Sequence, residues 1–503
     1  MHRRTVLKGI AASTVAGGVL GPDLFRGAWA ARAQAMGDGP FGPPTVDTGF
    51  GFTVPEGFSV RVVAVGGEEV AGTGYTWHPA SDGAGTYATP DGGWILVSNS
   101  EVNTDDVSGG ASALKFGPPG ADGVAPIEDA YRILGQEVGT PSAGNCAGGV
   151  TPWGTWFSAE ENAGAQHVWE CDPTGATPAI ELPQLGTFAH EAAVADPFTG
   201  IVYLTEDTGD SRFFRWVPDV TPAFGERPDF DDGRLQVMAL TGSEAVTGAG
   251  PATWIDVDAV DPSTYRPEGS TSFVRGEGLW YHDRIVYWVA STFSQIFAYD
   301  TRTDIQEILH DPAVVGSPMN DADNLCVHPM TGDLYITEDA PQSIGLDVLV
   351  ITAPDADGAR VVAPVIRVPP GGHPGSELTG PVFDPSGTRF YFSSQRMSSP
   401  NDPTNVTAGV IYEMTGPFVR AAPQPAPSEP APSEPPATEP PAGEEPTSAP
   451  SPDQEPATGG ATLPATGGDD VLGWAGLGVG AIGWLAARRA RAMDATRPEP
   501  DEA

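Results

Sequence analysis

The sequence predicts an all-β fold of the β-propeller type. It contains 64 glycines and 52 prolines in 503 residues, while 40% of the residues are hydrophobic. Turns are therefore dense, yet enough apolar material remains to form a core. Within residues 45–420 no segment has the 3.6-residue apolar period of an amphipathic helix, whereas short runs of alternating apolar residues recur. Short strands joined by many turns account for both observations.

The recurring unit is a proline-containing turn, a short strand and an acidic strand end. Its two clearest copies run from Asp196 to Asp207 and from His328 to Asp339. Looser copies end at Glu101, at the pair Glu160-Glu161 and at Gln395. Neighbouring strand ends are separated by about 45 to 60 residues, which is typical of one four-stranded propeller blade. This spacing predicts six to eight blades, and an array of β-sandwiches is the alternative.

A propeller would give these acidic strand ends a common location. Equivalent strands of successive blades surround one axis, so their ends converge at one mouth of the central channel. Carboxylates held close together raise one another's pKa and cannot all stay ionised unless cations compensate them. The sequence therefore predicts a metal site at this mouth, although each acidic pair taken alone could be a solvated turn.

Residues 1–35 have the features of an export signal. Arg3 and Arg4 precede a weakly apolar run of small residues, 10–20. A twin arginine before such a run resembles a Tat signal, which exports folded proteins, and a Sec signal with a chance arginine pair is the alternative. The Tat translocase is thus an expected partner.

The C-terminal region resembles a sortase sorting signal at residues 461–491. An LPATG pentapeptide (463–467) precedes a short hydrophobic helix at 471–487 and a basic tail, and 492–503 form a short polar tail. The expected motif residues are Leu463, Pro464, Ala465, Thr466 and Gly467. A simple membrane anchor is the alternative, and the basic tail fits the positive-inside rule either way. Residues 421–460 are rich in Pro, Glu and Ser and predict a disordered, semi-rigid stalk across the cell wall.

The charge of the chain narrows its possible partners. The formal net charge is −41, and Lys8 and Lys115 are the two lysines of the sequence. This excludes nucleic acid and anionic membrane surfaces, which require basic patches. Three cysteines, Cys146, Cys171 and Cys326, leave at least one thiol that is free, buried or bound to metal.

Several segments between residues 45 and 415 share the pattern of one known family. The most specific is Gly144–Trp156 with its continuation to Glu160-Glu161-Asn162. The other matching segments are His190-Glu191-Ala192, Tyr203–Asp207, Arg275–Tyr281, Asp323-Asn324, Glu338-Asp339 and Glu377–Pro381. Together these segments resemble the PhoX-type alkaline phosphatases.

The resemblance implies a six-bladed propeller with a mixed cluster of ferric iron and calcium. It implies catalytic roles for Arg275, Glu277 and Cys146, with Arg275 holding the phosphate by its planar fork. The expected metal ligands are Cys146, Glu160, Glu161, Glu191, Glu206, Glu277, Asn324, Glu338 and Asp339. A surface ion pair for Arg275 and a buried core position for Cys146 remain open. The chain departs from the family pattern at Asn99-Ser100-Glu101 and at Ser393-Ser394-Gln395-Arg396.

The expected function is metal-dependent hydrolysis of phosphate monoesters at the cell surface, for phosphate acquisition. The protein is expected to be a monomer, exported by Tat and then anchored to peptidoglycan by sortase or tethered to the outer face of the membrane. Two alternatives remain: a calcium-dependent lactonase-like propeller enzyme, which would need no thiolate ligand, and a non-enzymatic calcium-binding adhesion module on the wall. Iron content and ester hydrolysis distinguish the three.

Overall fold

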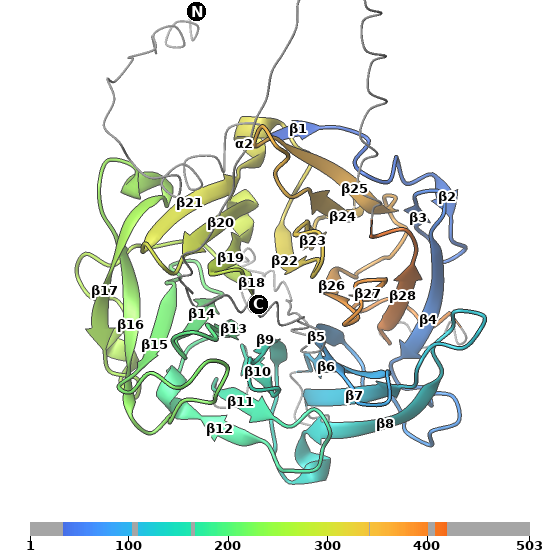
Figure 1. The fold of residues 1–503 in the computed structure, drawn as a ribbon, viewed down its shortest axis with the longest axis horizontal. Coiled ribbons are helices and arrows are strands. Elements are labelled where there is room, and N and C mark those ends of the chain that lie inside the picture. Colours follow the sequence, from blue (N-terminus) through green and yellow to red (C-terminus); the bar gives the residue numbers. More distant parts are fainter. Residues whose placement is uncertain (1–33, 103–108, 162–165, 342, 401–407, 420–503) are drawn as a thin grey trace, which may run out of the picture. The chain divides into compact units, whose positions relative to one another are not determined.

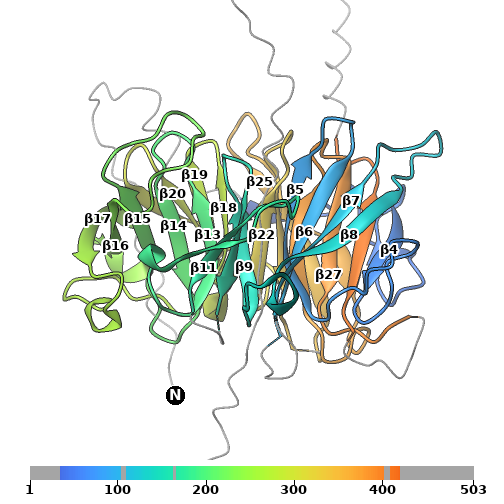
Figure 2. The ribbon, with the colours of Figure 1, turned by 90° about the horizontal axis from the view of Figure 1, so that it is seen from below.

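The computed structural model describes residues 34–102, 109–161, 166–341, 343–400 and 408–419. These residues form strands that pair antiparallel, except β1, and are joined by short turns, with one single-turn helix, α2 (Pro312–Val315), and five 3-10 turns. The prediction of an all-β propeller is confirmed: the sheets stand side by side around one axis (Figures 1 and 2).

Six strands line the axis, and each contacts the next around a closed ring. These inner strands are β5 (Ser81–Ala88), β9 (Asn145–Val150), β13 (His190–Ala195), β18 (Gly276–His282), β22 (Ala322–Val327) and β26 (Leu378–Phe383). Each pairs with the strand that follows it in the chain, and further strands add outward. The second strands are β6 (Trp94–Ser100), β10 (Trp156–Glu160), β14 (Val202–Glu206), β19 (Ile285–Ala290), β23 (Leu334–Glu338) and β27 (Arg389–Ser394). This is the arrangement that six blades would have, and we call each set a blade.

The outer strands complete the blades. They are β7 (Gly110–Phe116), β8 (Ile127–Leu134), β11 (Val168–Cys171), β12 (Ile180–Leu182), β15 (Phe214–Pro218), β16 (Gly233–Leu240), β17 (Gly250–Val257), β20 (Gln295–Asp300), β21 (Ile305–His310), β24 (Leu346–Ile351), β25 (Arg360–Val368) and β28 (Val410–Thr415). Strand β17 also pairs with β21, so two neighbouring blades share one nine-stranded sheet. Strands β2 (Val46–Asp47) and β3 (Thr53–Val54) add to the edge of β25, as does β1 (Gln34–Met36) in parallel.

The ring closes through the N-terminal part of the chain. Strand β4 (Ser59–Val65) pairs with β28 as the outermost strand of the last blade. The first and last parts of the propeller thus belong to one sheet, and the backbone hydrogen bonds between them close the ring.

The core lies between the blades. Trp156 of β10 is fully buried, and its indole N–H donates to Asn99 Oδ1 of β6 at 2.9 Å. Gly85 of β5 faces this ring so closely that a Cβ there would come within 2.9 Å of Trp156. Tight packing of this kind holds neighbouring blades in register at the axis.

Several predicted segments lie outside the described residues. They are residues 1–33 of the predicted signal peptide, the stalk at 421–460, the sorting signal at 461–491 with its motif, and the tail at 492–503. Among the residues that the structure describes, no helix is long and apolar enough to cross a membrane.

Candidate metal centre

In five of the six blades, a β-bulge at the start of the inner strand places one side chain at the axis. In β13, His190 pairs with Glu206 and the next pair is Ala193 with Leu204, so two residues of β13 face one of β14. The strands β5, β9, β18 and β22 are interrupted at the same point. Bulges of this kind redirect a side chain and are frequent near active sites. The first bulged residues are Asp82, Cys146, Glu191, Glu277 and Asp323.

A second ring of side chains follows the ends of the second strands. The residue after each of these strands donates its backbone N–H to the carbonyl just before the inner strand, at 2.9 to 3.1 Å. This hydrogen bond places the six residues equivalently. They are Glu101, Glu161, Asp207, Ser291, Asp339 and Gln395. Four carboxylates thus join those of the bulges at one mouth of the propeller.

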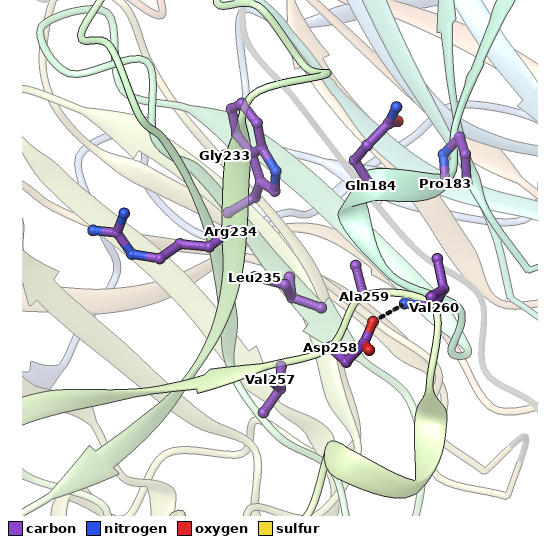
Figure 3. A pocket seen from close by; sticks show the side chains of 10 residues that line it. Pro183, Gln184, Gly233, Arg234, Leu235, Val257, Asp258, Ala259 and Val260 are labelled. Carbon is purple, nitrogen blue, oxygen red and sulfur yellow. Dashed lines mark hydrogen bonds between the residues drawn. The ribbon is translucent and has the colours of Figure 1, made fainter.

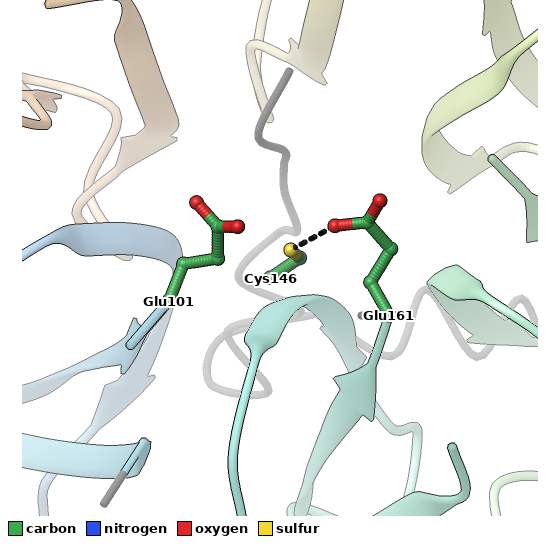
Figure 4. Close-up of side chains that lie close together, drawn as sticks. All are labelled: Glu101, Cys146 and Glu161. Atoms are coloured by element: carbon green, nitrogen blue, oxygen red, sulfur yellow. Dashed lines mark hydrogen bonds between the residues drawn. The ribbon is translucent and has the colours of Figure 1, made fainter. Parts of the chain in front are cut away.

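The two rings form three linked groups of potential ligands. The first, the cysteine triad, consists of Glu101, Cys146 and Glu161 (Figure 4). Glu161 also belongs to a central triad with Glu191 and Asp207, and the third triad adds Glu277 and Asp323 to Glu191.

In each triad the ligand atoms lie within 4.8 Å of one another. Because Glu161 and Glu191 are each shared by two triads, the groups form one arc rather than separate sites. The thiol of Cys146 donates to Glu161 Oε2 at 2.8 Å.

Several buried carboxylates at this mouth have oxygens that no protein donor satisfies. Both oxygens of Glu191 and of Asp323, together with Oε2 of Glu277 and Oδ1 of Asp82, have no hydrogen-bond partner among the described residues. An unpaired buried carboxylate oxygen is costly. Bound cations would satisfy these oxygens, so the residues present fit a metal centre.

The electrostatics lead to the same conclusion. Burial, reinforced by the carboxylates of Glu277 and Glu161, raises the pKa of Glu191 well above its ordinary value. Burial, with Glu277 next, does the same to the pKa of Asp323. Burial, then the carboxylates of Glu161 and Glu101, raises the pKa of the Cys146 thiol. Without cations these groups tend to hold protons, which a bound metal would displace.

Two arginines lie at the arc. Nε and Nη2 of Arg275 donate to the two carboxylate oxygens of Asp207 at 3.0 and 2.9 Å, and Nη2 lies 3.1 Å from Glu277 Oε1. Arg396 contacts Glu101 and Glu377.

The backbone conformation at Arg275 explains how it reaches the arc. Arg275 directly precedes β18 and has a φ of +55°. It reaches the arc because the backbone turns there, not because of strand periodicity.

Five expected ligands lie outside the triads, and three of these are the first residues of acidic strand ends. At each acidic strand end, the first acidic residue is the last one that pairs with the inner strand. Its side chain points to the opposite face of the sheet from that of the residue that follows it. The carboxylate of Glu160 accepts from Ser142 Oγ and the Trp169 indole N–H, at 2.7 and 3.1 Å. Glu206 and Glu338 belong to the same class.

Protein donors satisfy these last two carboxylates as well. Arg266 Nη2 donates to both oxygens of Glu206, at 2.7 and 2.8 Å. The backbone N–H groups of Asn320 and Asp347 donate to Glu338 at 3.0 and 2.8 Å. Because protein donors already satisfy these carboxylates and none is in a triad, we do not include Glu160, Glu206 and Glu338 in the candidate ligand set.

Asn324 and Asp339 lie beside the arc. Asn324 Oδ1 accepts from the backbone N–H of Gly380 at 3.2 Å, which ties β22 to β26. Asp339 occupies its place in the second ring, where burial and then the neighbouring carboxylate of Glu377 raise its pKa to about 10. Neither residue is in a triad.

Sequence reasoning missed five acidic residues of the mouth as ligands: Asp82, Glu101, Asp207, Asp323 and Glu377. Glu101, Asp207, Asp323 and Glu377 were visible as acidic residues of the repeat or of the family segments, but which residue of a strand end faces the mouth depends on the parity of the strand. The bulges shift that parity and leave no mark in composition. Asp82 follows the residues Pro-Ala-Ser, and no acidic pair or repeat motif marks it in the sequence.

The other two cysteines are separate from this centre. Cys171 on β11 and Cys326 on β22 are both buried and free. No disulfide joins these two cysteines.

A pocket on the outer part of the propeller contains none of the expected site residues. It is lined by Pro183, Gln184, Trp216, Val260, residues 233–235 and residues 257–259 (Figure 3). Arg234, its positively charged residue, is bonded to Asp219 at 3.0 Å. The triads, not this pocket, carry the candidate chemistry.

Comparison with known proteins finds a family model that matches part of the chain. A sequence model of the family "Alkaline phosphatase PhoX" matches residues 90–168 and 164–307. Those residues include the cysteine and central triads, Arg275 and Glu277. No curated protein sequence matches the chain.

Among solved structures, PhoX of Pseudomonas fluorescens in complex with vanadate, a transition state analogue, has a TM-score of 0.59 at 16% identity. The match covers 74% of this chain and 97% of that one. A streptogramin B lyase, with a TM-score of 0.36 at 13% identity, covers 72% and 98%, and a putative 6-phosphogluconolactonase from Bacteroides uniformis, at 0.33 and 14%, covers 65% and 82%. Residues 90–307 thus match an enzyme family, the PhoX alkaline phosphatases, and lie in a propeller with the fold of a PhoX.

Proposed function

We propose that the protein is a metal-dependent phosphatase that hydrolyses phosphate monoesters at a mixed iron and calcium centre. The observation that carries this proposal is the arc of three triads, in which buried carboxylate oxygens lack donors and one ligand is a thiol. The match to the PhoX family and the fold of a vanadate-bound PhoX support it.

The donor set assigns different ions to the two ends of the arc. Thiolate is a soft ligand that suits iron, so Cys146 with Glu101 and Glu161 would hold iron. Carboxylates are hard ligands that suit calcium, so Glu191 and Asp323 would hold calcium with the remaining oxygens. When bound, such ions neutralise phosphoryl oxygens and activate a nucleophile. A calcium-dependent lactonase would not use the thiol.

Arg275 is the residue of this chain that we place on the phosphoryl group. Its guanidinium is planar and carries five N–H donors. Its contacts with Asp207 and Glu277 use at most three of them. Its side chain is 20% exposed, whereas those of Asp207 and Glu277 are 6% and 1% exposed. The guanidinium therefore borders the open mouth, where it can stabilise charge that develops on the phosphoryl oxygens.

A direct assay tests the proposal. The full chain, purified and loaded with iron and calcium, is expected to hydrolyse a chromogenic phosphate monoester and to contain both metals by elemental analysis. A lactone substrate serves as the comparison. Metal-loaded protein that hydrolyses the lactone but no monoester would refute the phosphatase assignment, and iron-free active protein would refute the mixed centre.

We further propose that the protein acts as a monomer outside the cell. Export by the Tat translocase would carry the folded, metal-loaded propeller across the membrane, and sortase would join it to peptidoglycan at the LPATG motif. The twin arginine at residues 3–4 and the order of motif, apolar stretch and basic tail support this. Replacing Leu463 should release the protein from the wall fraction with its specific activity unchanged. Continued covalent attachment of that variant to the wall would contradict the sorting assignment.

A further inference from the structure

A second arginine, Arg396, lies at the end of the arc away from Arg275. Its Nη1 donates to Glu377 Oε1 at 2.6 Å, and its Nη2 donates to Glu101, a member of the cysteine triad. Its backbone N–H donates to Ser376 Oγ at 3.0 Å, which fixes the residue directly after Gln395 of the second ring. The position of Arg396 is thus set by the same strand ends that position the candidate ligands.

The two arginines stand on opposite sides of the axis. Arg275 contacts Asp207 and Glu277, which belong to the blades of β13 and β18. Arg396 contacts Glu101, from the blade of β5, and Glu377, from the blade of β26. The inner strands follow one another as β5, β9, β13, β18, β22 and β26 in a closed ring. The boundary between β13 and β18 is therefore diametrically opposite the boundary between β26 and β5.

Both guanidinium groups lie on the solvent side of the carboxylates. The side chain of Arg396 is 32% exposed, while those of Glu101 and Glu377 are 0% and 1% exposed. A guanidinium is not deprotonated in proteins, so Arg396 carries a positive charge at this mouth. The contacts with Glu101 and Glu377 use two of its five N–H donors, so others can reach an anion while these contacts hold.

We propose that Arg396 is a second anion-binding residue of this site and contacts the phosphoryl group from the side opposite Arg275. The inference rests on the proposed phosphatase function and adds to it a second arginine that binds the phosphoryl oxygens. An anion seated on the arc lies between two positively charged forks. Cations bound by Glu101 and Glu377 would neutralise these carboxylates. The positive charge of Arg396 would then be available to the anion.

Arg396→Lys tests the proposal, because lysine keeps the charge and removes the fork that spans two partners. Three quantities are measured on protein loaded with iron and calcium: metal content by elemental analysis, KM and kcat for a phosphate monoester, and the Kd for inorganic phosphate by titration calorimetry. We expect an unchanged metal content, with Kd for phosphate and KM raised about 10-fold by the lost charge-assisted hydrogen bonds. Arg234→Lys, a change in an exposed ion pair with Asp219, is the control and should match the wild type.

Two outcomes would overturn the proposal. A phosphate Kd within about twofold of wild type, with full metal content, would make Arg396 a counter-ion of Glu101 and Glu377 alone. Loss of metal would make it a support of the centre. Arg396→Gln, which is shorter and neutral, serves if the lysine variant does not fold, and we expect it to weaken phosphate binding further. A wild-type protein without phosphatase activity would refute the proposed function, whereas normal activity with unchanged phosphate binding in the variant would refute this inference alone.

Discussion

Glutamine replacements at Glu160 and Glu161 would show which side of the end of β10 holds the metal. The two residues are neighbours and both are buried, but only Glu161 belongs to the triads. Each replacement keeps the size of the side chain and removes its charge. The two variants therefore differ only in the position of the change.

The structure gives opposite expectations for the two variants. Glu161 belongs to the cysteine triad, which we propose for iron, and also to the central triad, whose Glu191 we propose for calcium. Losing even a group that supports a ligand costs 10–100-fold in metal affinity, so Glu161→Gln should weaken calcium binding by about 100-fold. At a calcium concentration of about 100 times the wild-type Kd, binding stabilises the wild type by about 2.7 kcal/mol, and this falls to about 0.4 kcal/mol in the variant. Without metal, Glu161→Gln should not be destabilised, because it removes one of several crowded carboxylates.

Glu160→Gln should keep its metal and lose stability. One carboxylate oxygen accepts from Ser142 and Trp169 and the other from the backbone N–H of His167. Glutamine retains a single acceptor oxygen, so a buried donor is left unpaired at a cost of about 1–3 kcal/mol, with and without calcium. Urea unfolding in calcium and in chelator, with elemental analysis, measures both effects. Metal lost from Glu160→Gln and retained by Glu161→Gln would refute the assignment of faces.

Three further predictions follow from the site. Cys146→Ser should lose iron and most phosphatase activity but keep the β fold by circular dichroism, because a hydroxyl is a poor iron ligand at neutral pH; retained iron with normal turnover would make Cys146 a core residue. In chelator, thermal stability should fall as pH rises, because burial raises the pKa of Glu277 from 4.5 to about 8 and that of Asp339 from 3.8 to about 10. Each carboxyl therefore contributes fully to the stability of the folded state below its ordinary pKa, and this contribution is lost as the pH rises through its raised pKa in the folded protein. Calcium should abolish this dependence of the melting temperature on pH. A melting temperature in chelator that does not change with pH would contradict the prediction. Arg275→Lys should lower turnover about 10²-fold at unchanged metal content, because the fork is lost where charge develops; wild-type kinetics would remove Arg275 from the mechanism.

The amino-acid sequence by itself determined the fold class and the kind of site. The repeat of turn, short strand and acidic end, seen best at 196–207 and 328–339, is local information, because turn residues and alternating side chains act within a few positions of each other. The same repeat placed carboxylates at equivalent strand ends, and the family segments added Cys146, Glu191 and Arg275. A ligand-bearing mouth was therefore predictable before any coordinates.

Only the tertiary structure decided which member of each acidic pair faces the axis. The strands that end at Glu160, Glu206 and Glu338 are buried on both faces, so no polar and apolar alternation marks the inward side. The bulges at the start of the inner strands then add one residue and shift the parity, and a one-residue shift exchanges the two faces of a strand. The opposition of Arg275 and Arg396 is likewise a property of the closed ring, because residues 121 positions apart face each other only when the ring of blades closes.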